Sequence, residues 1–498
     1  MTQRRSCAIA LLLILQLVKS IPAETIPPQV AGGFYPAGAA ELKRTVEKYV
    51  REASTFTVQS EIVAALVPHA GYAYSGKTAA LVYRILQGRS YPTVIIIATG
   101  HRHGVRGAAT IDSGGFATPL GKVPIDEAAV KTLQKLTPLI EHLPQAYQRE
   151  HSIEVQLPFL QTVLKNQFKI VPLLMNNEDP KIASQIGEAL AQFMKNKKMF
   201  LLVSSDLAHY PDTKIARLVD SATLKTILEP EWGPAYLWQA SRFIMERGPK
   251  ELVCTYCGEA AVLAALYAMD KTGTRAQLLQ YVNSGELPGI GDTNRTVGYA
   301  SLLWLRGAKS RKQTSLTDQQ KKELLRLARQ ALLKKLNKGE EPERKLWPDP
   351  ELNLPASVFV TLRRKDQPHG ASLRGCIGSL LPDLPLAEAV QVYAIKSALE
   401  DPRFQTVKPD ELTKIHIEIS KLTPFRKTPS HEAIKSGQGV LLGQGRNSGL
   451  FLPSVWEDIP AKENFLGELC QQKARLPRDC WKDPKTEIQV FDAEKFEE

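Results

Sequence analysis

From Thr25 to about Leu305, short apolar runs alternate with longer amphipathic stretches. Four runs are typical of buried strands: Ile62–Val67, Val94–Ala98, Phe168–Met175 and Phe200–Ser204. Segments with helical spacing lie between them, namely Ala39–Ala53, Lys77–Gln87 and Asp179–Lys195. Because strands that alternate with helices form parallel sheets with covered faces, the pattern predicts an α/β domain with a central, largely parallel sheet flanked by helices.

A polar, basic segment at residues 306–315 predicts a linker to a second domain. Thr317 and Gln320 then form a capping-box pattern ahead of apolar positions at helical spacing. Further along, strand-like runs at Val358–Leu362, Ile415–Leu422 and Val440–Leu442 mix with helical segments at Leu386–Leu399 and Lys462–Lys473. We therefore expect an α+β domain over residues 316–496, after an α/β domain over residues 28–305.

The amino terminus has the features of an export signal. Arg4 and Arg5 precede the apolar run Cys7–Val18, and Ser20 or Ala23 offers a small residue for cleavage. The run is too short to span a bilayer comfortably. We expect residues 1–23 to be a removed signal peptide and the protein to be exported, periplasmic or extracellular, with no stable membrane span; an uncleaved tether is the alternative.

Composition narrows the function classes. With 43% hydrophobic and 23% charged residues among 498, the chain is typical of globular proteins. Its net charge of +12 is spread along the chain without a groove-reading motif, so we expect no specific nucleic-acid binding. Signal removal would leave five of the six cysteines. This odd, low count argues against a disulfide framework.

Histidines give the strongest indication of chemistry. His69, His101 and His209 each follow a predicted strand, and Asp206 lies in the same segment as His209. Residues just past the carboxyl ends of strands converge on the ligand crevice of an open α/β sheet. Imidazoles there bind Fe, Cu or Zn, or transfer protons. We expect one shared site, the alternative for each histidine being a purely structural role.

The pair Cys254 and Cys257 adds two thiols. A single CxxC is compatible with a redox pair, a small disulfide, two buried thiols or a mixed His/His/Cys site. Without a second CxxC, an all-cysteine zinc site is not expected.

Six ordered motifs resemble the Memo family over residues 28–305. They are Gly32-Gly33-Phe34-Tyr35-Pro36, Pro68-His69-Ala70-Gly71-Tyr72, Gly100-His101, Glu150-His151-Ser152-Ile153-Glu154, Ser204-Ser205-Asp206-Leu207-Ala208-His209 and Cys257-Gly258. This family is similar in fold to class III extradiol dioxygenases. The resemblance places His69, His101 and Cys257 at the metal site and Asp206 and His209 in the same pocket as catalytic groups. It gives His151 and Glu154 a supporting role in binding.

Three departures from this resemblance alter the expected chemistry. Cys257 stands where a dioxygenase has a carboxylate, and a soft thiolate favours Cu(I), Zn or thiolate-bound iron. Arg102 puts a fixed positive charge beside the site, which favours an anionic ligand. The third is export, because relatives are usually intracellular; in an oxidising space Cys257 and Cys254 could form a disulfide that removes a ligand. We expect iron or copper, with zinc possible, and no nucleotide cofactor.

In the second half, Leu373-Arg374-Gly375-Cys376-Ile377-Gly378 is the most distinctive run. Arg374 is suited to bind an anion or carboxylate, with Cys376 beside it; the alternative is a tight turn with a buried cysteine. The spacing Gly443, Gly445 and Gly449 between two strand-like runs predicts a hairpin rather than a phosphate loop.

This half resembles the AMMECR-type domain over residues 316–496. The motifs are Leu373–Gly378, Ala398–Phe404, Gly449–Pro453 and Leu476–Trp481. The family implies an α+β fold of unsettled role. With a Memo protein and a radical-SAM protein it forms the AmmeMemoRadiSam set, which implies a functional link to a radical-SAM protein.

Three functions follow from these observations. The first is a metal-dependent, dioxygenase-like redox enzyme acting on a small molecule or peptide. The second is a non-catalytic metal- or peptide-binding scaffold. The third, zinc-assisted hydrolysis, has no supporting HExxH motif.

Overall fold

The computed structural model describes residues 25–195, 197–307 and 315–498. Its largest sheet has eight strands in the order β10-β11-β2-β9-β3-β8-β4-β7. The bounds are β2 Glu61–Val67, β3 Thr93–Thr99, β4 Ala108–Thr110, β7 Ile140–His142, β8 Lys169–Met175, β9 Met199–Ser204, β10 Thr274–Asn283 and β11 Gly298–Arg306. The central strands β2, β9, β3 and β8 are parallel, as the sequence predicts.

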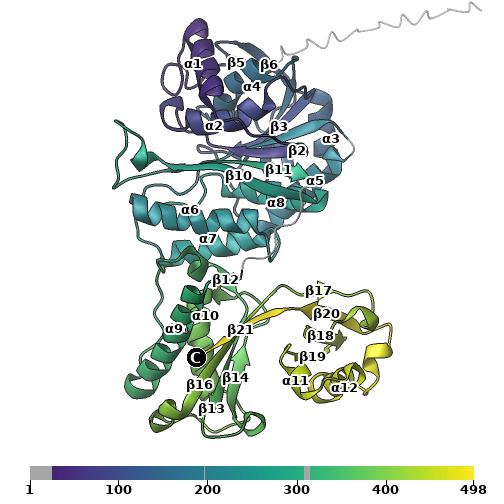
Figure 1. The fold of residues 1–498 in the computed structure, drawn as a ribbon. Helices are drawn as coiled ribbons and strands as arrows, with labels where there is room; N and C mark the ends of the chain where they lie inside the picture. The colour runs from purple at the N-terminus through teal and green to yellow at the C-terminus, as the bar shows by residue number, and fades with distance from the viewer. Residues whose placement is uncertain (1–24, 196, 308–314) are drawn as a thin grey trace, which may run out of the picture.

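Helices cover both faces of this sheet (Figure 1). Helices α1 (Ala39–Glu52), α2 (Tyr72–Leu86) and α4 (Leu157–Val163) lie above it, and α5 (Pro180–Met194) and α8 (Glu259–Thr272) lie below. The other helices are α3 (Glu127–Leu136), α6 (Thr213–Leu228) and α7 (Ala235–Arg247). The mixed α/β architecture with a central sheet is the predicted fold class.

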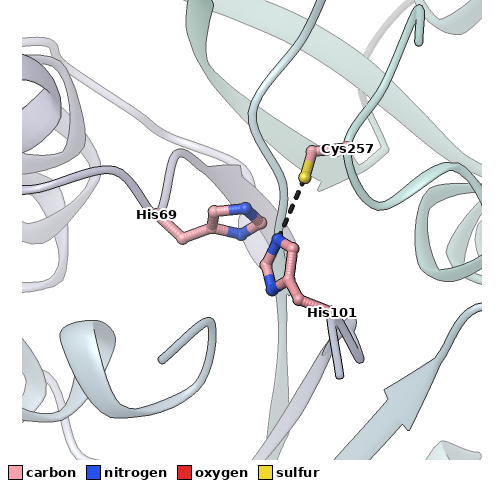
Figure 2. Close-up of side chains that lie close together, drawn as sticks. All are labelled: His69, His101 and Cys257. Atoms are coloured by element: carbon pink, nitrogen blue, oxygen red, sulfur yellow. Dashed lines mark hydrogen bonds between the residues drawn. The ribbon is translucent and has the colours of Figure 1, made fainter. Parts of the chain in front are cut away.

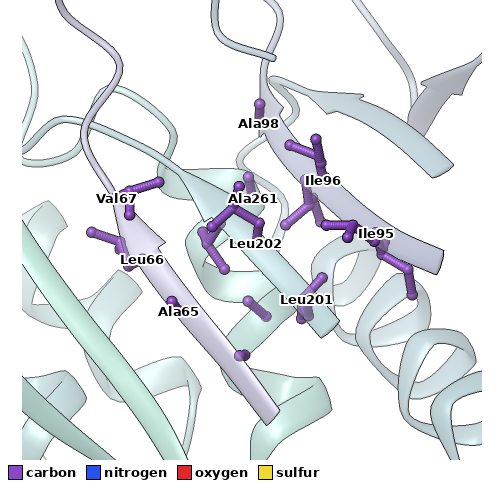
Figure 3. Close-up of a cluster of buried hydrophobic side chains, with 14 of the residues drawn as sticks. Ala65, Leu66, Val67, Ile95, Ile96, Ala98, Leu201, Leu202 and Ala261 are labelled. Carbon is purple, nitrogen blue, oxygen red and sulfur yellow. The ribbon is translucent and has the colours of Figure 1, made fainter. Parts of the chain in front are cut away.

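Buried strands form the core of the first domain. Figure 3 shows side chains of β2, β9 and β3 packed together with Ala261 of α8, where Leu66, Ile96 and Leu202 have no exposed surface. A small separate sheet joins β1 (Thr25–Ile26), β5 (Gly115–Thr118) and β6 (Gly121–Pro124). The antiparallel strands β10 and β11 extend the large sheet beyond its parallel centre.

The second domain has two lobes. In the first lobe, α9 (Asp318–Lys338) and α10 (Leu386–Leu399) cover the sheet β14-β13-β16-β21, built from Leu373–Gly378, Val358–Arg364, Ile415–Leu422 and Ala493–Glu497. The second lobe carries the sheet β17-β20-β18-β19, from Arg426–Lys427, Glu487–Phe491, Gly439–Gln444 and Asn447–Phe451. Helices α11 (Val455–Asp458) and α12 (Lys462–Glu468) and a π-helical turn at Leu469–Ala474 belong to this lobe. Strands β12 (Pro355–Ala356) and β15 (Leu384–Pro385) pair with each other.

Two local predictions for this domain are confirmed. The Thr317 side chain accepts from the Gln320 backbone, forming the expected capping box at the start of α9. Strands β18 and β19 form the expected hairpin, with Gln444 opposite Asn447 across a two-residue turn. Gly445 in that turn has φ of +62°, which glycine adopts without strain.

The two domains meet at α6 and α7 of the first (Figure 1). Arg247 donates to Glu388 from Nη2 at 2.6 Å, and both side chains are buried. The Tyr236 hydroxyl donates to the Pro355 carbonyl at 3.0 Å, and Leu354 packs into an apolar cluster with α6 and α7. The interface therefore combines apolar packing with a buried ion pair.

Four sequence expectations are tested by the structure only in part or not at all. The predicted signal peptide at 1–23 and most of the linker at 306–315 lie outside the described residues. Within the described part of the chain, no helix is long and apolar enough to cross a membrane. Cys470 and Cys480 form a disulfide, whereas Cys254, Cys257 and Cys376 are free thiols. The expectation of no disulfide framework therefore needs one correction, a ten-residue loop closed by that bond.

Candidate functional site

Three neighbouring strand ends build the candidate site. His69 follows β2, Asp206 follows β9 and His101 follows β3, and these strands are adjacent and parallel in the sheet. Their carboxyl ends therefore meet at one edge. The structure therefore brings these three residues together at one edge of the sheet, as the sequence predicts.

Glu150 fixes the orientation of His101. The Glu150 carboxylate accepts from the His101 backbone nitrogen at 2.6 Å and lies 2.9 Å from its Nδ1. Burial alone would raise the pKa of Glu150, but the hydrogen bonds from His101 and the Ser152 backbone lower it to about 2. An ionised carboxylate on Nδ1 leaves Nε2 of His101 free to bind, the arrangement common behind metal-bound histidines.

Cys257 completes a three-residue cluster with His69 and His101 (Figure 2). Sγ of Cys257 lies 3.1 Å from Nε2 of His101, and one donor atom from each residue lies within 4.8 Å of the others. The Cys257 backbone nitrogen donates to the Asp206 carbonyl, which holds this loop against the end of β9. Burial raises the pKa of the Cys257 thiol.

His69 is buried against Asp206 and Ser204. Its backbone nitrogen donates to Asp206 Oδ1 at 2.7 Å, and its Nδ1 lies 3.3 Å from the Ser204 hydroxyl. Burial and repulsion from His101 and His209 lower the pKa of His69 to about 3. The ring is therefore neutral near pH 7 and keeps a lone pair for a ligand.

His151 stacks on His101, with ring centroids 4.6 Å apart and planes 15° apart. Burial and the charges of His69 and His101 lower its pKa to about 3. His101, Glu150 and His151 form a second group whose donor atoms lie within 4.8 Å of one another. His151 therefore lies in contact with the cluster, and its expected supporting role in binding stays a prediction.

Glu154 contacts a different part of the molecule. It accepts from the backbone nitrogens of Gln29 and Val30 and from the Tyr35 hydroxyl, at 2.6, 3.1 and 2.5 Å. Burial raises its pKa. These contacts tie the amino-terminal segment to the domain, and no hydrogen bond among the described residues joins Glu154 to the histidine cluster.

His209 and Asp206 lie at the same edge but do not form a hydrogen-bonded pair within the described chain. Asp206 contacts His69 instead, and burial raises its pKa. His209 donates from Nδ1 to the Leu207 carbonyl at 2.9 Å, which leaves the lone pair on Nε2. Arg102 is exposed, and among the described residues its side chain makes no hydrogen bond.

In the second domain, the two predicted binding residues, Arg374 and Cys376, lie on the same strand but have different surroundings. Arg374 forms a two-pronged pair with Glu411 and also donates to the Gln405 and Thr406 carbonyls. These bonds give Arg374 a structural role in the free protein. Cys376 instead lines a cleft between the two lobes, with Thr361 donating to its sulfur at 3.2 Å.

Sequence reasoning did not assign two important groups. Glu150 was part of a recognised motif, and its place directly before His151 was the available signal. Arg403, which donates to Asp401 beside Cys376, lies in the motif Asp401-Pro402-Arg403. The contact of Glu150 with His101 and that of Asp401 with the Cys376 backbone join distant segments, so spacing alone does not specify them.

Together, the fold and cluster define an α/β domain with histidine and cysteine donors at the carboxyl edge of its sheet, followed by an α+β domain. Residues 27–303 match the family model described as Memo-like protein, and residues 325–496 match AMMECR1. The chain belongs to the Memo family and carries an AMMECR1 domain behind its Memo-like domain.

Two MEMO1 family proteins and one solved structure are similar to parts of this chain. A MEMO1 family protein of Nitrosopumilus maritimus is 31% identical over 283 residues, which is 56% of this chain and 98% of the relative. One from Ignicoccus hospitalis is 35% identical over 295 residues, covering 55% of this chain and 97% of the relative. The crystal structure of an uncharacterized protein from Pyrococcus horikoshii is 42% identical with a TM-score of 0.36, and the match covers 37% of this chain and 93% of that one.

Proposed function

We propose that this protein is an exported metal-binding oxidoreductase whose site consists of His69, His101 and Cys257. The observation that carries the proposal is the convergence of two imidazoles and one thiol, with donor atoms within 4.8 Å of one another. Metal–nitrogen bonds of about 2.0 Å and metal–sulfur bonds of about 2.3 Å bring this spacing close to the reach of one ion.

The donor set fits iron or copper, with zinc as a further possibility. Nitrogen donors suit all three metals, while the thiolate favours Cu(I), Zn or thiolate-bound iron. The raised pKa of the Cys257 thiol keeps it protonated in the free protein. Because a metal binds the thiolate, metal binding would release this proton. A bound iron or copper ion would supply one-electron and dioxygen chemistry at an open coordination position, and no nucleotide cofactor is required.

The chain's own residues supply the proton chemistry. His209 carries a lone pair on Nε2, because Nδ1 donates to the Leu207 carbonyl, so it can take a proton from a bound substrate. Asp206 holds the His69 backbone and so positions that ring. Arg102, exposed beside His101, would attract an anionic small molecule or peptide.

Export rests on the amino-terminal pattern and on a second observation. Cys470 and Cys480 form a disulfide, and such bonds persist mainly in oxidising compartments. A functional link to a radical-SAM protein rests only on the AmmeMemoRadiSam resemblance. Secretion of a fusion carrying residues 1–24 ahead of a reporter tests export directly.

Metal content of residues 24–498, purified without oxygen, tests the site. We expect about one equivalent of iron or copper in the parent and none in a variant with His69→Ala and Cys257→Ser. A parent that takes up no added Fe(II), Cu(I) or Zn(II) would overturn the proposal. The matched control is Cys376→Ser, which removes a free thiol outside the cluster.

The second candidate function is a non-catalytic metal- or peptide-binding scaffold. The buried contact between the domains favours it, since Arg247 and Glu388 hold them together without involving the cluster. Oxygen uptake separates the two functions. A metal-loaded protein with His209→Gln should lose uptake but keep its metal if the protein is an enzyme, whereas a parent without uptake or turnover is a scaffold.

A further inference from the structure

The second domain contains a cleft of about 590 Å³ between its two lobes. This volume lies within the range of about 300–1,000 Å³ that small-molecule sites occupy. Phe359, Thr361 and Cys376 of the first lobe line one side, and Leu452, Val455 and Lys473 of the second lobe line the other. The cleft is separate from the histidine cluster, whose residues all belong to the first domain.

The wall formed by β14, β13 and β16 is polar, although the opposite face of this sheet is apolar. Cys376, Thr361 and Glu418 are directly opposite one another across the three strands and all line the cleft. Val360 and Ile419, one position along, are buried in the core of the domain. Antiparallel sheets commonly place one face on the core and leave the other polar and open, so this polar row is accessible to a ligand that enters the cleft.

The acidic groups on this wall are already neutralised. Glu418 pairs with Arg363 at 3.4 Å and with Lys495 at 2.9 Å. Asp401 accepts two bonds from Arg403 and one from the backbone nitrogen of Cys376. On this wall the lining residues Arg363 and Arg403 therefore offset Glu418 and Asp401, and Lys495 adds a second cation beside Glu418.

Arg403 is held in place while part of its guanidinium stays available. Its Nε and Nη2 donate to Asp401 at 2.9 and 2.7 Å, and Nη2 also lies 3.3 Å from the Cys376 carbonyl. Nη1 has no partner among the described residues, and the side chain is 47% exposed. Lys473, on the opposite wall, likewise has no ion-pair partner within the described chain. A preorganised guanidinium is well suited to a carboxylate.

We propose that this cleft binds a small organic acid, with its carboxylate on Arg403 and Lys473 and its apolar body against Phe359, Leu452 and Val455. Glu457 and Asp458 also line the cleft, but both are exposed to solvent, where water screens their repulsion. The inference concerns a site other than the histidine cluster and does not depend on a bound metal.

Calorimetric titration of the full chain with 3-phenylpropionate, 3-phenylpropionamide and phenethylamine tests this charge preference. We expect the acid to bind and the neutral amide to bind about 10- to 100-fold more weakly, the value of one lost charge-assisted hydrogen bond. Three results would each overturn the proposal: equal affinity for acid and amide, preference for the amine, or no binding of the acid at concentrations up to about 10 mM.

Variants locate the site. Arg403→Gln and Lys473→Gln should each weaken binding of 3-phenylpropionate about 10-fold or more. Lys473→Gln keeps the test decisive if loss of Arg403 unfolds the domain, because Lys473 is exposed. The control is Arg364→Gln, on the same strand as Arg363 but paired with Asp366 outside the cleft. Unchanged affinity in both cleft variants would place the ligand elsewhere.

Cys376 provides an independent readout. Its thiol lines the cleft, so bound acid should slow the alkylation of Cys376 by iodoacetamide at pH 8.5. Peptide mass mapping measures the rate of this alkylation. Cys257, in the other domain, serves as the internal control and should react at an unchanged rate. Equal protection of both thiols, or of neither, contradicts binding in the cleft.

Discussion

Replacing Glu150 by glutamine should weaken metal binding without removing any proposed ligand. One carboxylate oxygen, Oε1, takes bonds from His101 Nδ1 and the backbone nitrogens of His151 and Ser152, at 2.9, 2.8 and 2.9 Å. The other, Oε2, accepts from the His101 backbone at 2.6 Å. A glutamine has only one oxygen, so in either orientation its amide group points a donor at a donor.

The size of the effect follows from these contacts. The pKa of Glu150 falls from 4.5 to about 2, so its environment favours the ionised form. That shift corresponds to about 3 kcal/mol. Loss of one charge-assisted bond to His101 costs about 1.5–3 kcal/mol. We therefore expect metal affinity to fall about 10- to 100-fold, because the His101 ring loses the group that orients it.

Glu154→Gln is the matched control. Glu154 lies four positions on, is equally buried and accepts three hydrogen bonds, but its partners are Gln29, Val30 and Tyr35. Competition against a chelator of known affinity measures Fe(II) or Zn(II) binding in both variants, and thermal unfolding checks their folding. Unchanged metal affinity in the Glu150 variant, or equal losses in both, would refute the positioning role.

Three further predictions concern stability. Burial raises the pKa of Asp220 in the folded protein to about 7. The unfolded chain therefore loses this proton at a lower pH than the folded protein does, and the stability of the fold falls as pH rises from about 4 to 7. Asp220→Asn should remove that fall, which is worth up to about 4 kcal/mol at pH 8, and unfolding curves at pH 4 and pH 8 measure it. Reducing the Cys470–Cys480 bond should lower stability by about 2–3 kcal/mol, and melting with and without dithiothreitol measures it. Arg247→Met leaves the buried carboxylate of Glu388 with Arg344 at 3.3 Å as its remaining ion-pair partner and should cost about 3 kcal/mol, the low end for breaking a buried pair, seen as a lowered or split unfolding transition; a double variant with Glu388→Leu should recover most of it.

The central part of the fold was predictable because its signals are local. Four buried strands are continuous apolar runs, and the capping box of α9 lies within four residues. Helix α2 begins at Tyr72, earlier than the predicted Lys77, because polarity does not follow burial in its first turn: the apolar Ala73 and Tyr74 are exposed, whereas Ser75 is buried. The pairing of β10 with β11 joins segments separated by a 14-residue connection, which local patterns do not specify.

The candidate site likewise has one part that the sequence predicts and another part that depends on contacts between distant segments. Parallel strands bring their carboxyl ends together whatever their loops contain, so the meeting of His69, Asp206 and His101 followed from strand order. Glu150 reaches His101 from a loop with neither helical nor strand periodicity. Arg374 was assigned to a ligand by its residue type, whereas its partner Glu411 lies 37 positions away and takes up its charge within the protein. Residue chemistry predicts what a group can bind but not which partner folding brings to it.

The interface between the domains is linked to the candidate site through the chain itself. The loop with His209 leads into α6, and the loop with Cys257 follows α7, the two helices that contact the second domain. The two loops are joined, because the His209 backbone nitrogen donates to the Cys254 carbonyl and the Val253 nitrogen donates to the His209 carbonyl. A shift of α6 against α7 would therefore move the imidazole of His209 and the sulfur of Cys257 together. The second domain, by contacting these helices, supports the geometry of the proposed metal site in the first domain.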